Sequence, residues 1–473
     1  MEDIVSKAAH VTPSARQLAW QELEFTTFVH FGMNTFTNRE WGEGKEDPKL
    51  FNPTDFDAAQ WVAACKEAGM RLLILTAKHH DGFCLWPSQY TEHSVKNSPW
   101  KDGKGDVVRE VADACRKGGV KFGIYLSPWD RHEKTYGDSP AYNAHFKNQL
   151  RELLTNYGEI SEVWFDGACG EGPNGRRQEY DWPGFYAVVR ELQPNACIAI
   201  CGPDVRWCGN EAGECRESEW SVLPAFGVKD PIESASFSCA VMEADLGSRD
   251  ALRKAAEKGA SLIWYPAEVN TSIRPGWFYH AGEDGKVKPL AHLLDIYYDS
   301  VGGNAAFLLN VPPDPRGRFH ENDVARLKEL GDILNTTFAR NLAAGAAATP
   351  SSTRNGDPKY AAKNTLDGDK DTYWITNDGD TAATIEYDLG EPKTFNRAML
   401  QEYIKAGQRI EEFYLDIWDG QSWEPIAHAM TVGYKRLLRF NETAARKVRL
   451  RITQSRLSPT LATFGLFQEP PNR

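Results

Sequence analysis

The sequence predicts an α/β protein: a (β/α)8-type, TIM-like barrel followed by a C-terminal antiparallel β-sandwich. A chain of 473 residues is too long for one ordinary domain. Through the first two-thirds, short apolar runs alternate with amphipathic stretches, which is typical of a parallel sheet covered by helices. The last part instead alternates apolar and polar residues between turn residues. We expect the barrel to span residues 1–338 and the sandwich residues 339–473.

The barrel region contains eight candidate strands, and about eight strand–helix units fit a barrel better than a doubly wound sheet. The sixth and seventh are the weakest, so the barrel is expected to be irregular there. Helix patterns at 55–69, 106–119 and 142–158 end at Gly, as a helix C-terminus prefers, and a closing helix should begin at Glu321. The candidate strands begin at Phe25, Met70, Lys121, Ile160, Ala196, near Cys215, at Gly259 and at Asn304.

The expected sandwich begins after a lead-in rich in small residues, Pro and Gly. Its candidate strands have a period of two, so that one face packs on the core and the other meets solvent. Trp374 is expected in this core. The candidate strands lie at 383–390, 413–420, 423–430 and 447–454.

Composition excludes several classes of partner. With 66 acidic and 54 basic residues the net charge is −12, which argues against nucleic acid and against adhesion to an anionic membrane. No window approaches the ~18 consecutive apolar residues of a membrane span, and the first residues do not form a signal peptide. We therefore expect no membrane insertion. The protein would be extracellular or periplasmic if a leader has been removed, and cytoplasmic otherwise.

Nine cysteines lie between Cys65 and Cys239. No CxxC pair occurs, and the spacings match no zinc template. A disulfide scaffold is not expected at this chain length, so these residues should be buried free thiols.

Polar and aromatic residues follow the predicted strands at their C-terminal ends, where a barrel places its active site. Asp166 ends a buried strand, which is costly unless the carboxylate is paired or reactive. It could instead cap a helix or pair with arginine. Gly167 would allow close approach of a substrate. The strand-end residues are His30, Lys78, His79, His80, Asp81, Tyr125, Trp129, Trp164 and Asp166.

The adjacent histidines, His79 and His80, could ligate a metal, but neighbours on a strand point to opposite faces. We expect one to face the mouth and the other to pack sideways. Hydrogen bonding to substrate hydroxyl groups is therefore favoured over a chelate.

Glycosidases usually use a second carboxylate. The segment 206–220 offers four glutamates, and spacing alone cannot select one of them. They are Glu211, Glu214, Glu217 and Glu219.

Several long motifs between Phe25 and Pro313 resemble the α-L-fucosidases of glycoside hydrolase family 29. They are VHFGMNTFTNREWG, LTAKHHDGFCLWPS, GIYLSPWDR, EVWFDGACG, PDVRWCGNEAGE and RPGWFYH. The resemblance implies a barrel, a retaining mechanism without a cofactor, and fucosylated oligosaccharides or glycoconjugates as substrates. Only Cys208 departs from it, standing where an apolar residue is expected.

The same resemblance implies residue roles. Asp166 is expected to be the nucleophile. The form of WCGNEAGE resembles the branch acting on α-1,3/1,4-linked fucose in Lewis-type glycans, which selects Glu211 as acid/base, with Glu214 as second choice. The residues expected to bind fucose are His30, Glu40, Trp41, His79, His80, Tyr125, Trp164 and Trp277.

The C-terminal part resembles discoidin-type (factor 5/8 C-terminal) sandwiches, through NTLDGDKDTYWIT and KVRLRITQS. Such a module could bind sugar, could hold a structural calcium ion near Asp367, Asp369 and Asp371, or could be a spacer packed on the barrel.

Three other functions remain open. One is a fucosidase of broader or α-1,2/1,6 preference, or a related hydrolase for galactose-configured substrates. Another is a non-catalytic glycan-binding barrel, against which the two carboxylates argue. The last is a metal-dependent hydrolase, which the absence of ligand spacing disfavours.

Overall fold

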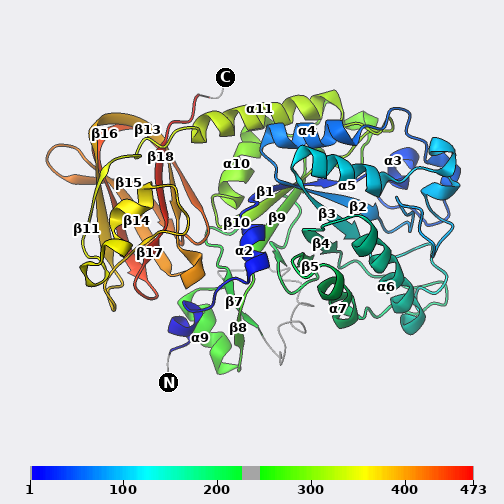
Figure 1. Cartoon of the computed structure of the whole chain (residues 1–473), viewed down its shortest axis with the longest axis horizontal. Coiled ribbons are helices and arrows are strands. Elements are labelled where there is room, and N and C mark those ends of the chain that lie inside the picture. Colours follow the sequence, from blue (N-terminus) through cyan, green and yellow to red (C-terminus); the bar gives the residue numbers. More distant parts are fainter. Residues whose placement is uncertain (1–2, 226–245, 472–473) are drawn as a thin grey trace.

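The structure is a computed structural model that describes residues 3–225 and 246–471. Its first domain is a parallel sheet of eight strands, nearly closed into a barrel in the order β5-β4-β3-β2-β1-β10-β9-β6 (Figure 1). A parallel bridge from Ala199 to Val205 joins the two edges. The expected barrel is thereby confirmed. The strands are β1 (Phe25–Val29), β2 (Leu72–Lys78), β3 (Lys121–Leu126), β4 (Glu162–Phe165), β5 (Cys197–Ile200), β6 (Arg206–Trp207), β9 (Ala267–Ser272) and β10 (Ala305–Asn310).

The sixth and seventh strands differ from the prediction. No described strand lies at Cys215; the sixth barrel strand is the two-residue β6. The apolar run from Gly259 forms two strands, because Pro266 has no backbone N–H to continue the ladder. Its first half, β8 (Ser261–Trp264), leaves the barrel and pairs antiparallel with β7 (Val222–Ala225). Its second half is the barrel strand β9.

Helices surround the sheet, and the closing helix begins at Glu321 as predicted. Gly69 and Gly119 end α4 and α5 in the left-handed region, with φ of 89° and 71°. No helix in the described part of the chain is long and apolar enough to cross a membrane. The helices are α1 (Ile4–Ala8), α2 (Ala15–Gln21), α3 (Met33–Thr37), α4 (Ala58–Ala68), α5 (Val107–Gly118), α6 (Ser139–Asn156), α7 (Trp182–Leu192), α9 (Arg249–Glu257), α10 (Leu290–Ser300) and α11 (Glu321–Phe338).

The second domain is the expected antiparallel sandwich. Its six-stranded sheet has the order β11-β13-β16-β14-β15, with β18 beside β13, and β12 pairs with β17. Trp374 is fully buried in its core, as predicted. The strands are β11 (Ala347–Pro350), β12 (Trp374–Ile375), β13 (Ala383–Gln401), β14 (Ile410–Trp418), β15 (Trp423–Met430), β16 (Arg436–Ser455), β17 (Thr460–Leu461) and β18 (Thr463–Phe467).

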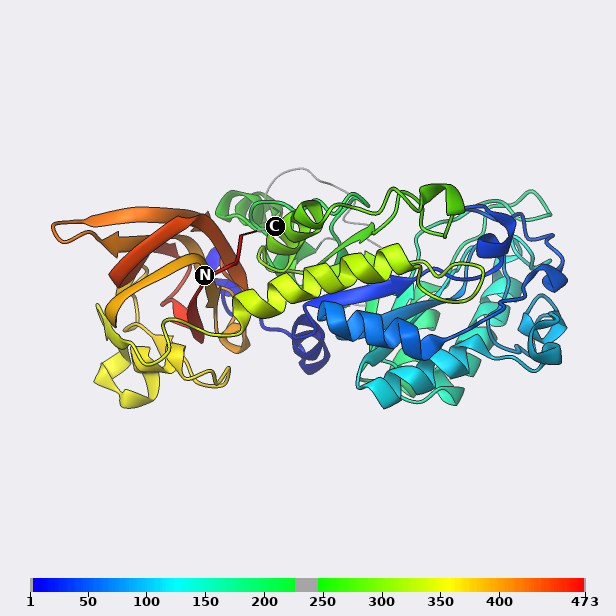
Figure 2. The same cartoon turned by 90° about the horizontal axis from the view of Figure 1, so that it is seen from above.

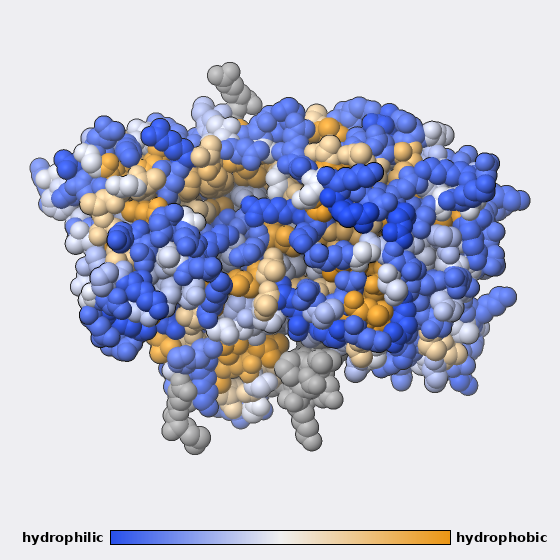
Figure 3. Space-filling model, in the orientation of Figure 1, coloured by the Kyte–Doolittle hydropathy of each residue, from blue (hydrophilic) through white to orange (hydrophobic). Residues whose placement is uncertain are grey.

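The two domains pack side by side, and α11 extends from the barrel toward the sandwich (Figure 2). The face in Figure 3 is largely hydrophilic, with apolar residues showing in the hollow between the domains. Polar contacts cross the interface: Arg249 forms a bidentate ion pair with Glu411, and Gln408 accepts from the backbone N–H of Ser221 at 2.8 Å. The sandwich therefore supports the chain that follows β6.

Candidate active site

A cavity of about 290 Å³ lies at the C-terminal mouth of the barrel. It brings together nine of the ten residues predicted for catalysis or fucose binding, and both predicted catalytic carboxylates are among them. Of the predicted site residues, only Glu40 does not line it. The lining is Phe28, His30, Trp41, His79, His80, Tyr125, Trp164, Asp166, Ala168, Glu211, Asn270 and Trp277.

Asp166 directly follows β4, whose alternation turns Glu162, Trp164 and Asp166 toward the barrel axis. Its Oδ1 accepts a hydrogen bond from the backbone N–H of Ala168 at 2.7 Å, and its Oδ2 accepts from the Tyr125 hydroxyl at 3.0 Å. Burial, with the nearby charge of Asp166, raises the pKa of Tyr125 well above its usual value. Tyr125 is therefore a neutral donor to the Asp166 carboxyl group.

Glu211 stands on the loop that follows β6. Its Oε2 accepts from the indole N–H of Trp277 at 3.1 Å. Asn210 shapes the loop, because its side-chain oxygen accepts from the backbone N–H groups of Ala212 and Glu214 at 3.0 and 3.1 Å. Glu211 is exposed at the rim, so it can meet both a substrate and water.

The other three glutamates of this segment are placed differently. Glu214 is exposed and does not line the cavity. Glu217 is exposed as well. Glu219 is buried in ion pairs with Arg206 and Arg216, which hold its pKa below the usual range despite burial. Among the four, the cavity contains Glu211 alone.

The cavity histidines are neutral. Burial lowers the pKa of His30 to about 3, and burial lowers the pKa of His79 and His80 as well. Their partners define the tautomers. His30 Nδ1 lies 2.8 Å from the Asn310 oxygen and His80 Nδ1 lies 2.7 Å from Ser127 Oγ, which itself donates to a carbonyl. Both therefore donate through Nδ1 and present Nε2 to the cavity as an acceptor.

His79 adopts the opposite tautomer, with its proton on Nε2. The amide nitrogen of Asn34 lies 3.4 Å from His79 Nδ1, and it donates at 2.9 Å to the Glu40 carbonyl. His79 Nδ1 is thus an acceptor, which leaves Nε2–H as a donor toward the cavity. The three imidazoles together offer two acceptors and one donor, a set suited to hydroxyl groups.

The prediction that His79 and His80 point to opposite faces is wrong. Both line the cavity, with ring centroids 4.0 Å apart. β2 ends at Lys78, so the alternation of a strand does not apply beyond it. Lys78 is the residue that points away, forming a buried ion pair with Asp130 at 2.8 Å.

Trp164 offers its ring rather than its indole N–H, which donates to Glu268 at 2.8 Å below the cavity. It stacks with Tyr125 at 5.4 Å and packs edge-on against Phe28 at 4.9 Å. Trp41 is 58% exposed and contacts His80 from the rim. The cavity therefore has apolar faces beside its hydrogen-bonding groups.

Glu40 holds the loop that carries Trp277. Its carboxylate accepts from the backbone N–H groups of Trp277 and Phe278 at 2.8 and 3.1 Å, and it contacts His280 Nε2 at 2.6 Å. The side chain is partly exposed. The structure thus gives Glu40 a supporting contact, and the contact with fucose that the resemblance implies stays a prediction.

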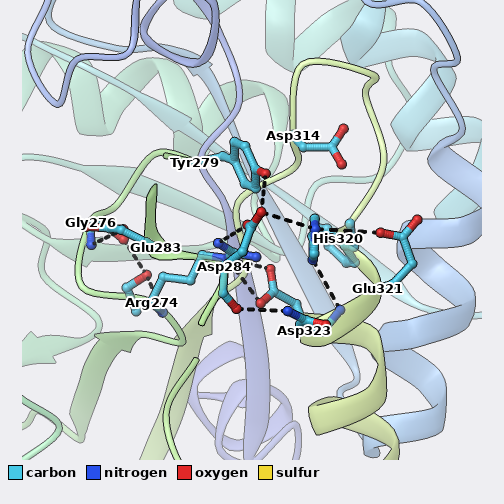
Figure 4. A network of polar contacts seen from close by, with 12 residues as sticks. Arg274, Gly276, Tyr279, Glu283, Asp284, Asp314, His320, Glu321 and Asp323 are labelled. Carbon is cyan, nitrogen blue, oxygen red and sulfur yellow. Dashed lines mark hydrogen bonds and ion pairs between the residues drawn. The ribbon is translucent and has the colours of Figure 1, made fainter. Parts of the chain in front are cut away.

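The same loop is also tied down at its base (Figure 4). Arg274 is buried and forms ion pairs with Asp323 on α11 at 2.8 Å and with Asp284 at 2.9 Å. Tyr279 donates to Asp284 at 3.2 Å. Trp277 is consequently held between two polar networks, one at Glu40 and one at Arg274, which explains how a partly exposed ring keeps its position.

Two carboxyl groups lie buried beneath Trp164. Glu162 accepts from the indole N–H of Trp20 at 2.7 Å, and Glu268 accepts from that of Trp164. The second oxygen of each receives no hydrogen bond from a donor of the described residues. Burial, followed by the charge of Glu268, raises the pKa of Glu162 well above its usual value. The pair therefore shares at least one proton at neutral pH.

This pair should make stability depend on pH. Burial raises the pKa of Glu268 from 4.5 to about 7, so its contribution is complete below 4.5 and is lost as the pH rises through 7. Glu268→Gln cannot titrate yet keeps an acceptor for Trp164. Between pH 5 and pH 8 the wild type should lose on the order of 3 kcal/mol more unfolding free energy than this variant. Denaturant unfolding at several pH values measures this difference, and parallel curves would contradict it.

Two groups of residues were considered as metal ligands, the aspartates of the sandwich and the histidines of the cavity. Asp367, Asp369 and Asp371 are exposed, and their oxygens accept from the turn's own N–H groups or pair with Lys405. Within the described residues they do not gather into a group that could hold a metal ion, and neither do the cavity histidines. These three carboxylates therefore do not form a group of side-chain ligands, and the predicted calcium ion is not confirmed.

Sequence reasoning missed three supporting asparagines. Asn270 on β9 lines the cavity and accepts from the Trp207 indole at 2.9 Å. Asn310 ends β10 and joins His30 to the Trp277 carbonyl. Both are polar residues in otherwise apolar barrel strands, so the strand-end rule applied to His30 could have found them. Asn34 lies on α3, and no sequence signal marks it.

Known proteins resemble both domains of this chain. A family model described as Alpha-L-fucosidase matches residues 19–337, and an F5/8 type C domain model matches residues 347–463. Alpha-L-fucosidase 1 of Arabidopsis thaliana is 43% identical over 97% of this chain and 87% of its own length.

Solved structures agree as well. A glycoside hydrolase 29 family member from an unknown rumen bacterium has a TM-score of 0.80 and 40% identity, covering 98% of this chain and 78% of its own. A Ruminococcus gnavus GH29 fucosidase in complex with fucose has a TM-score of 0.87 and 34% identity, covering 98% and 95%. The chain therefore belongs to the α-L-fucosidases of glycoside hydrolase family 29, with an F5/8 type C domain at its C-terminus.

Proposed function

We propose that this α-L-fucosidase releases terminal α-1,3/1,4-linked L-fucose from branched, Lewis-type oligosaccharides with retention of configuration. One observation supports it most: Asp166 and Glu211 line the same cavity, one at its floor and one at its rim. A retaining glycosidase needs such a pair, one carboxylate as nucleophile and the other as acid/base.

In the first step, Asp166 attacks the anomeric carbon and the glycosidic bond breaks. Glu211 gives its proton to the departing oxygen, and a covalent fucosyl–Asp ester forms. In the second step, Glu211 takes a proton from water, whose oxygen attacks the same carbon and releases fucose and the Asp166 carboxylate. Ala168 and Tyr125 hold the two carboxylate oxygens, so the nucleophile is oriented before substrate arrives.

Recognition of fucose would use the neutral histidines and the aromatic faces. Fucose offers three free hydroxyl groups when glycosidically linked, and each can donate and accept. His30 and His80 would accept from them through Nε2, and His79 would donate. The ring of Trp164 or Trp277 would contact the apolar C6 methyl group.

The linkage preference is tested by comparing two substrates. A Lewis-type trisaccharide with α-1,3- or α-1,4-linked fucose and a 2′-fucosylated trisaccharide are incubated in parallel, and released fucose is measured. We expect fast release from the branched sugar and little from the other. The reverse preference would agree with fucosidase activity but reject the α-1,3/1,4 linkage preference. No release from either substrate would favour a glycan-binding barrel without catalytic activity.

Removing Glu40 should weaken substrate binding more than chemistry. Glu40→Ala leaves two backbone N–H groups without their acceptor and loosens the Trp277 loop, so KM should rise by about tenfold with a smaller change in kcat. Glu43→Gln is the matched control, because Glu43 is exposed and only pairs with Arg39. A loss confined to kcat would show that Glu40 acts otherwise.

A further inference from the structure

Two cysteines stand at the base of the loop that carries Glu211. Cys208 directly follows β6, and Cys215 lies where the chain returns, so the pair encloses the segment from Gly209 to Glu214. Their sulfur atoms and a carboxylate oxygen of Glu219 all lie within 4.8 Å of one another. Cys208 is fully buried and Cys215 is partly exposed.

We propose that Cys208 and Cys215 form a reversible disulfide that closes the Glu211 loop and slows the step in which Glu211 donates its proton. Two thiols at this separation need only a small displacement to reach the sulfur–sulfur bond length of about 2.05 Å. Gly209 and Gly213, with φ of 106° and 85°, lie on either side of Glu211 and give the loop backbone torsions outside the usual range.

The hydrogen bonds around Cys208 tolerate loss of its proton. The single thiol proton has two alternative acceptors, the Glu214 carbonyl at 3.3 Å and Glu219 Oε1 at 3.4 Å. The Glu214 carbonyl keeps the side-chain N–H of Asn210 at 2.9 Å, and Glu219 keeps its arginine partners. Removing a buried donor usually costs free energy because it leaves an acceptor unpaired. Oxidation of Cys208 avoids this cost, because both acceptors keep another donor.

A metal ion is the less favoured occupant of this cluster. Both oxygens of Glu219 are bound by guanidinium groups, Oε2 by Arg206 and Oε1 by Arg216. A cation would have to displace or lie beside these positive charges, and among the described residues it would find three ligands where structural zinc usually has four.

Oxidation requires a small-molecule disulfide such as oxidised glutathione. The thiolate of partly exposed Cys215 attacks it, forming a mixed disulfide and releasing one reduced thiol. Cys208 then attacks the Cys215 sulfur, the intramolecular bond forms, and a second reduced thiol leaves. Cys215 is partly exposed as a residue, but its thiol group is surrounded by protein. The hydrogen bond with Cys208 and this burial raise the pKa of Cys215 well above its usual value, so the reaction should be slow at neutral pH and faster at alkaline pH.

Glu211 stands at the tip of the loop that Cys208 and Cys215 enclose. Its carboxylate has one described side-chain partner, Trp277, so its position depends on the base of the loop. Drawing Cys208 and Cys215 together moves that base relative to Asp166 on β4. Displacements near 1 Å are enough to cost large factors in rate, and we expect about a tenfold fall where protonation is needed. This part of the inference rests on the proposed acid/base role of Glu211.

The full-length protein is incubated with oxidised glutathione at about pH 8.5, alkylated, and digested with trypsin. Arg206 and Arg216 place both cysteines in one tryptic peptide, residues 207–216. We expect this peptide to lose two hydrogen atoms and both alkylation sites, and to regain them with a reductant. Two free thiols in it, retained glutathione, or a cross-link to Cys239 would overturn the proposal.

Activity is measured on the same samples with two substrates. The kcat/KM for a fucosylated trisaccharide should fall about tenfold and recover on reduction. The kcat/KM for α-L-fucosyl fluoride reports the first step, in which the leaving group needs no proton, and it should change less than about twofold. Cys215→Ser should abolish the response, and Cys169→Ser, the other partly exposed described cysteine, should keep it. An unchanged trisaccharide rate in the disulfide form would overturn the proposal that the disulfide slows catalysis. An equal fall for both substrates would leave the disulfide in place and reject Glu211 as proton donor.

Discussion

Asp166→Asn should remove nearly all fucosidase activity while leaving the fold intact. The amide keeps an acceptor for the Ala168 N–H but has no negative charge with which to attack the anomeric carbon. We expect kcat to fall by at least about 10³-fold. Steady-state hydrolysis of a fucosylated trisaccharide and of fucosyl fluoride measures this, and both substrates should be affected alike because both need the nucleophile.

Asp166→Ala provides a sharper signature, because it opens space for an external anion. Azide should restore part of the activity but not the wild-type rate, and the product should be a fucosyl azide with inverted configuration. A thermal unfolding midpoint close to that of the wild type excludes loss of fold as the cause. Normal turnover in either variant would transfer the nucleophile's role to another residue.

Glu211→Ala should separate substrates by their leaving groups. Without the proton donor, a sugar leaving group departs poorly, so trisaccharide hydrolysis should fall by about 10²- to 10⁴-fold. Fucosyl fluoride should be spared in the first step, because fluoride departs without protonation. The pH profile of kcat/KM should also lose the limb that reports the acid. Steady-state kinetics over a range of pH values measure both effects.

Glu214→Ala is the matched control for Glu211→Ala. Glu214 stands on the same loop and is equally exposed, but it does not line the cavity. Its replacement should change turnover of either substrate by less than about threefold. If instead Glu211→Ala cleaves the trisaccharide normally and Glu214→Ala does not, the acid/base assignment passes to Glu214.

Much of the barrel could be predicted because its strands are buried on both faces. Continuous apolar runs such as residues 72–75 of β2 have few alternatives, and capped helices such as α4 and α5 have local start and stop signals. The prediction of the sixth and seventh strands was wrong because β6 has two residues and β8 is as apolar as a barrel strand. Local sequence cannot say which of two apolar segments joins the parallel sheet.

The sequence by itself determined the family resemblance, the barrel, and the position of Asp166 at the end of β4, because strand period and strand ends are local properties. Spacing left four nearby glutamates open and the resemblance selected Glu211, but only the tertiary structure shows which of them lines the cavity, since that depends on where the loop after β6 meets Trp277. It also joined Glu40 to the Trp277 loop and turned both His79 and His80 inward. These outcomes depend on contacts between segments far apart in the chain, about which local patterns contain no information.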